Sequence, residues 1–105
     1  MQQLDRAYLN ELIKAISKIK EYIYKYGDYS IEKYSDCIYC LNWLLNNTKF
    51  VQGHLPKMPT KKQRKNAVDV VTEVAEADNL KESKLQEIKA CAEIVKREID
   101  KQLPY

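Results

Sequence analysis

The chain has 105 residues, of which 45% are hydrophobic and 31% charged, and this length and composition indicate one globular domain, residues 1–105. Its formal net charge of +3 is concentrated, because five of the 18 basic residues lie between residues 57 and 66, which leaves 13 against 15 acidic residues elsewhere. A uniformly basic, histone-like protein is therefore excluded.

Apolar residues at alternating spacings of three and four predict a first helix over about residues 4–26. This seam consists of Leu9, Leu12, Ile16, Ile19, Ile23 and Tyr26. We expect Gly27 to end the helix, because glycine tolerates the positive φ of a C′ residue. Tyr8, Ile13 and Tyr22 flank the seam and make a broad apolar face, which predicts self-association.

A second helix is expected to begin at Asp28 or Ser30, both of which are favoured N-cap residues. Its apolar face comprises Tyr34, Cys37, Ile38, Leu41, Leu44 and Leu45. Trp43 lies off this face, and it either borders the face or serves a second packing contact. Residues 46–59 then form a connection that is long for a compact helical domain.

Thr60-Lys61-Lys62-Gln63 fits a capping box and predicts the start of a third helix. The apolar stripe of this helix has small side chains: Ala67, Val68, Val71, Val74 and Ala75. Asn79 and Ser83 are competing start signals for a fourth helix, whose seam is Leu85, Ile88, Ala92, Val95 and Ile99. The sequence therefore predicts an all-α fold, a compact up-and-down four-helix bundle with a long loop between helices 2 and 3.

The cysteines and the single histidine give no complete metal site. Cys37 and Cys40 share a helix face in a C-x-x-C pattern, but a structural zinc needs four ligands, and Cys91 and His54 each stand alone. We expect Cys37 in the core and Cys40 at its edge, since free cysteine is commonly buried. With no recognisable nucleophile or orienting carboxylate around His54, the sequence predicts neither an enzyme nor a cofactor.

The sequence also indicates a cytoplasmic protein that does not enter a membrane. Residues 1–6 lack the charge and apolar pattern of a signal peptide, and the most apolar stretch is short. The odd number of cysteines, three, has no disulfide-framework spacing.

The basic segment is the clearest functional signal. Its cations stand at the start of a helix, where the helix dipole disfavours positive charge, and we predict that they bind an anion. They are Lys57, Lys61, Lys62, Arg64 and Lys65. Two alternatives stay open: neutralisation by carbonyls or by Glu98 and Asp100 on neighbouring helices, and a simply solvated face.

The sequence thus predicts a small non-enzymatic helical binding module that engages nucleic acid, a nucleotide or an acidic protein surface. The alternative is a structural or regulatory protein–protein module, an oligomer or an inhibitor, that uses a tyrosine-rich helical face. Seven of the eight tyrosines lie between Tyr8 and Tyr39, and tyrosine is enriched at interfaces. The candidate interface residues are Tyr22, Tyr24, Tyr29 and Trp43.

Overall fold

The computed structural model describes residues 6–28, 30–48 and 57–103, and these residues form helices and connections without any strand. The helices are α1 (Arg6–Tyr26), α2 (Glu32–Thr48), α3 (Lys61–Ala75) and α4 (Glu82–Gln102). The predicted all-α fold, a compact four-helix bundle with a long link between its second and third helices, is confirmed.

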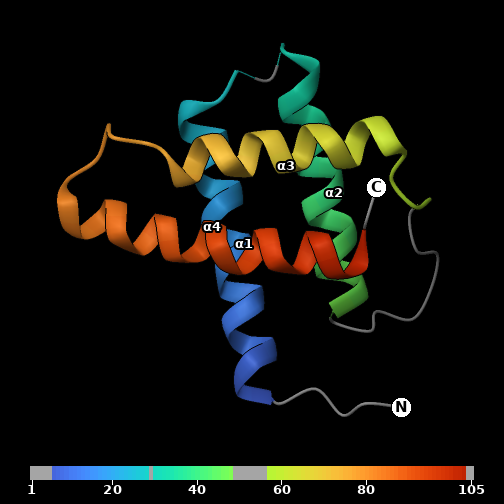
Figure 1. The fold of residues 1–105 in the computed structure, drawn as a ribbon, viewed down its shortest axis with the longest axis horizontal. Coiled ribbons are helices and arrows are strands. Elements are labelled where there is room, and N and C mark those ends of the chain that lie inside the picture. Colours follow the sequence, from blue (N-terminus) through green and yellow to red (C-terminus); the bar gives the residue numbers. More distant parts are fainter. Residues whose placement is uncertain (1–5, 29, 49–56, 104–105) are drawn as a thin grey trace.

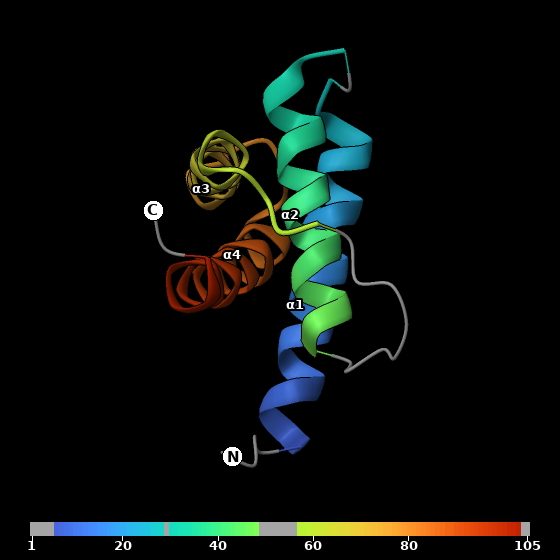
Figure 2. The same cartoon turned by 90° about the vertical axis from the view of Figure 1, so that its right-hand side faces the viewer.

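The four helices form two antiparallel pairs that cross each other. α1 and α2 run side by side in opposite directions, and α3 and α4 lie across one face of this pair (Figure 1, Figure 2). α3 packs most extensively on α2, and α4 contacts both α1 and α3. The Cα radius of gyration is 13.4 Å. One apolar core therefore lies between the crossed pairs.

The core follows the three-four seams that the sequence predicts. Its largest fully buried side chains are Leu12, Ile16, Ile19, Ile23, Leu41, Leu44, Ile99, Leu103, Val70, Val71, Val95 and Cys37. The seam of α1 is buried only in its middle, since Leu9 is half-buried and Tyr26 is 44% exposed. Among the described residues, none of the helices is long and apolar enough to cross a membrane.

Gly27 follows the last residue of α1, as predicted, but it does not adopt the positive φ that was expected of a C′ glycine. Its N–H donates to the carbonyl of Ile23 at 2.7 Å and so continues the helical pattern. A Cβ at this position would lie 2.7 Å from that same carbonyl oxygen and 3.2 Å from Cδ1 of Tyr34. Glycine is needed here chiefly because a Cβ would clash with the carbonyl of Ile23 in α1, and the ring of Tyr34 on α2 limits the space further.

The predicted helix starts have mixed outcomes. Thr60 caps α3 as expected, with both bonds of the capping box to Gln63 present. Asp28, in contrast, accepts from the N–H and the hydroxyl of Ser30, at 2.9 and 2.7 Å, and shapes the turn before α2. Neither Asn79 nor Ser83 caps α4, whose N-cap is Lys81 without a side-chain hydrogen bond.

Candidate functional site

The segment before α3, residues 57–60, is attached to the bundle at both of its ends. The hydroxyl of Tyr39, on α2, donates to the carbonyl of Lys57. Pro59 is buried, and Thr60 holds the first turn of α3 through its capping box with Gln63. The basic residues that the sequence singled out therefore stand on a fixed backbone.

Three of these five basic residues form an exposed group at the start of α3. Lys57, Lys61 and Lys65 are exposed, and no described residue forms an ion pair with any of them. We call these three the lysine surface. The N-terminal end of a helix carries about half a positive charge, which adds to their field.

The other two basic residues face the bundle. Lys62 donates to Glu32, at the start of α2, with an Nζ–Oε1 distance of 3.0 Å, and both side chains stay largely exposed. Arg64 is half-buried, and its Nε is buried without a hydrogen-bond partner among the described residues. The structure thus distinguishes the three exposed lysines that have no described ion-pair partner from Lys62, which is exposed but paired with Glu32, and from Arg64, which is half-buried.

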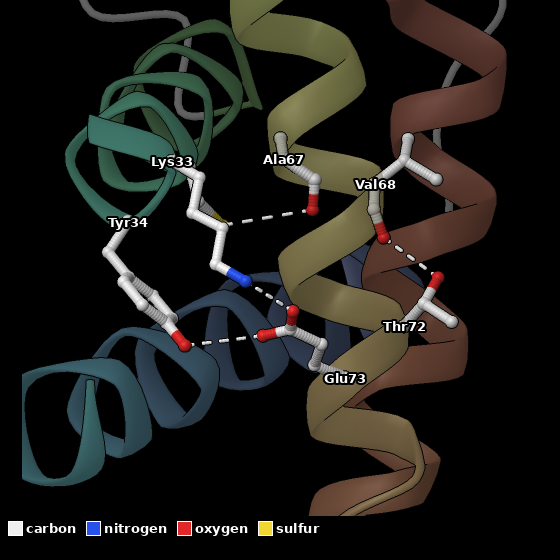
Figure 3. A network of polar contacts seen from close by, with 7 residues as sticks. Lys33, Tyr34, Ala67, Val68, Thr72 and Glu73 are labelled. Carbon is white, nitrogen blue, oxygen red and sulfur yellow. Dashed lines mark hydrogen bonds and ion pairs between the residues drawn. The ribbon is translucent and has the colours of Figure 1, made fainter. Parts of the chain in front are cut away.

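The acidic end of α3 is also partly neutralised by α2. Glu73, in the last turn of α3, accepts from Nζ of Lys33 at 2.5 Å and from the hydroxyl of Tyr34 at 3.3 Å (Figure 3). The hydrogen bond to Glu73 raises the pKa of Lys33 above its usual value. Adjacent residues of α2, Glu32 and Lys33, therefore bind opposite charges at opposite ends of α3. From the sequence, Glu98 and Asp100 were open alternatives as partners of the basic residues, whereas the described partner of Lys62 is Glu32.

The three described interface candidates differ in exposure and in their contacts. Tyr22 is half-buried, donates to Oδ1 of Asn79 at 2.8 Å and packs on Tyr26 with ring centroids 4.7 Å apart. Tyr24 is 54% exposed on the end of α1. Trp43 is half-buried on α2 against the core. Tyr29 lies outside the described residues.

Cys37, Cys40 and Cys91 are buried free thiols, so Cys40 belongs to the core and not to its edge as predicted. Burial raises the pKa of the Cys40 thiol to about 12, and it raises that of Cys37 further. The Cys37 thiol donates to the carbonyl of Ala67 at 3.9 Å. The described residues contain no cluster of potential metal ligands, and His54 lies outside them.

A buried polar chain links three helices and was not predicted. Glu98, 2% exposed on α4, accepts from the hydroxyl of Tyr8 on α1 and from Nε2 of Gln102 at 2.5 Å. Gln102 in turn accepts from Nδ2 of Asn47 on α2 at 2.6 Å. Burial, followed by the hydrogen bond to Glu98, raises the pKa of Tyr8 to about 12. In the sequence, the only indication of this polar chain is that Glu98 follows Val95 by three residues and so falls on the apolar face of α4.

Comparison of the chain with known proteins gives no relative from which a role could be transferred. The chain matches no protein-family model, no curated protein and no solved structure.

Proposed function

We propose that this protein is a small non-enzymatic binding module whose lysine surface engages an anionic macromolecule. One observation carries the proposal: Lys57, Lys61 and Lys65 are exposed at a helix start, and no described carboxylate pairs with them. The dipole of α3 makes this the least favourable end of the helix for cations, so an external anion gives them a role.

The ion pairs between α2 and α3 indicate which basic residues remain available to a partner. α2 supplies Glu32 to Lys62 and Lys33 to Glu73, which offsets one misplaced charge at each end of α3. The fold thus neutralises part of the unfavourable pattern and leaves the lysine surface to solvent. We expect the external partner to contact the residues that the bundle does not pair.

The experiment is a binding titration with two polyanions, a labelled DNA duplex and a labelled polyglutamate peptide, followed by fluorescence anisotropy. Three phosphate contacts predict that affinity for the duplex falls about 40-fold between about 50 and about 200 mM salt. The polyglutamate arm distinguishes an acidic protein surface from nucleic acid. Absence of salt-dependent binding to either polyanion contradicts the proposal.

A matched pair of variants localises the binding. Lys61→Glu/Lys65→Glu should weaken polyanion binding about tenfold or more, because repulsion replaces two contacts. Lys14→Glu/Lys89→Glu makes the same change in net charge at exposed positions of α1 and α4. This control should retain most of the affinity. Equal losses in both variants would show that net charge, and not the lysine surface, governs binding.

A second candidate function is self-association through the corner where α1 meets α2. Tyr24, Tyr26 and Ile31 are exposed there at 54%, 44% and 44%. Exposed large apolar side chains are a common feature of protein interfaces. Sedimentation of the wild type and of Tyr26→Ser/Ile31→Ser checks this candidate. A monomer at all concentrations removes it.

A further inference from the structure

A groove between α1 and the start of α4 lies apart from the lysine surface. It has a volume of about 240 Å³, and residues from both helices line it. Its apolar lining is made by Tyr22, Tyr26, Leu80 and Ile88. Two of its cations, Lys25 and Lys84, form no ion pair with a described residue. We call it the α1–α4 groove. It is smaller than a typical small-molecule pocket of about 300–1,000 Å³, and its size suits an inserted side chain.

The walls of the α1–α4 groove are held by contacts on the protein itself. The hydroxyl of Tyr22 donates to Asn79 at 2.8 Å, and the rings of Tyr22 and Tyr26 lie 4.7 Å apart. Lys18 and Glu87 form an ion pair at 2.6 Å between α1 and α4. These contacts fix the groove before any partner arrives, which lowers the ordering cost of binding.

The charges around the α1–α4 groove favour an anion. Lys18 and Glu87 satisfy each other, which leaves Lys25 and Lys84 against Glu21. Lys25 also lies 5.5 Å from the centroid of the Tyr26 ring, which places its charge beside the apolar lining. In addition, Leu80 directly precedes the N-cap of α4 and Lys84 lies in its first turn, at the positive end of a helix without a side-chain cap.

We propose that the α1–α4 groove binds an acidic peptide segment of another protein that inserts one apolar side chain. The apolar lining receives the side chain, and Lys25 and Lys84 pair with flanking carboxylates. Burial of an apolar anchor inside a charged border is the usual composition of such interfaces. The site is separate from the lysine surface, so failure of one proposal leaves the other intact.

The test uses the full chain as the target for a displayed library of random peptides. Enriched peptides should combine Asp or Glu with an aromatic or aliphatic residue. Lys25→Glu/Lys84→Glu should abolish their binding, and Leu80→Ala should weaken it about tenfold by removing apolar contact without changing charge. Lys61→Glu/Lys65→Glu, with the same charge change at the lysine surface, should bind them like the wild type.

Two further measurements complete the design. Circular dichroism melts verify that each variant is folded, and amide chemical shifts of the labelled protein should move at Leu80 and Ile88 when an enriched peptide is added. Enrichment of neutral or basic peptides, or no enrichment, overturns the proposal. So does binding that persists in Lys25→Glu/Lys84→Glu, or shift changes confined to the lysine surface or to a contact between two copies of the chain.

Discussion

At the scale of the residue, Tyr8 and Glu98 form a polar pair where the seams of α1 and α4 would otherwise be apolar. Tyr8→Phe removes one of the two donors to a buried carboxylate. We expect it to destabilise the protein by about 1–3 kcal/mol, the usual cost of a buried group that loses a partner. Chemical denaturation measures the change, and Tyr26→Phe, at an exposed tyrosine, is the control.

The raised pKa of Tyr8 adds a pH dependence to the same variant. Because the folded pKa lies near 12 and the unfolded value near 10, the fold favours the protonated phenol. Its contribution is complete below pH 10 and is lost as the pH rises through 12. The stability difference between wild type and Tyr8→Phe should therefore shrink over this range. A constant difference contradicts the proposed bond.

Gly27 gives a second prediction at this scale. Gly27→Ala should destabilise the protein by about 1–3 kcal/mol, because the new Cβ meets a backbone carbonyl that cannot move independently. Ser17→Ala, at an exposed position of α1, is the control for the gain in helix propensity. Equal or greater stability of Gly27→Ala in urea unfolding would exclude the clash.

At the scale of the element, the adjacent residues Lys61 and Lys62 at the start of α3 have different surroundings, because only Lys62 forms an ion pair with a described residue. Lys61→Glu should stabilise the protein by about 0.3–1 kcal/mol at low salt, since an acidic residue suits the positive end of a helix. Lys62→Glu should be destabilising by comparison, because it places a second carboxylate beside Glu32. Thermal melts at low and high salt check both signs. Stabilisation by both variants would remove a role for the Lys62–Glu32 pair.

The sequence predicts these elements well because each depends on neighbouring residues. The seams of the four helices and the capping box of Thr60 and Gln63 are visible as spacings along the chain. The starts of α2 and α4 were missed because no side-chain cap marks them in the expected way.

The sequence predicted which basic residues make up the candidate site but not which of them pair with other helices. The five basic residues are contiguous and easily recognised, yet Lys62 binds Glu32 across 30 positions of the chain. The crossing of the two helix pairs determines this contact, and helical periodicity carries no information on crossing. The α1–α4 groove was missed for the same reason, since its lining comes from α1 and from the segment that opens α4.

At the scale of the whole molecule, the buried thiols report on global unfolding. Cys37 and Cys40 are fully buried with raised pKa values, so they react through the rare open state and not as native thiolates. Cys91, 9% exposed, should react first with a thiol reagent. Modification rates of the other two should rise with urea in parallel with unfolding. Rapid modification of Cys37 or Cys40 in native buffer contradicts this core.

The contact between Tyr8 and Glu98 joins residues 90 positions apart and has a consequence for synthesis on the ribosome. α1 leaves the ribosome before α4, which supplies the buried partner of Tyr8. Until α3 emerges, α1 and α2 have only each other, and the faces that later receive α3 and α4 are open to solvent. The nascent chain therefore cannot complete its core before α4 has emerged, and a chain truncated before Glu98 lacks the carboxylate that joins α4 to α1.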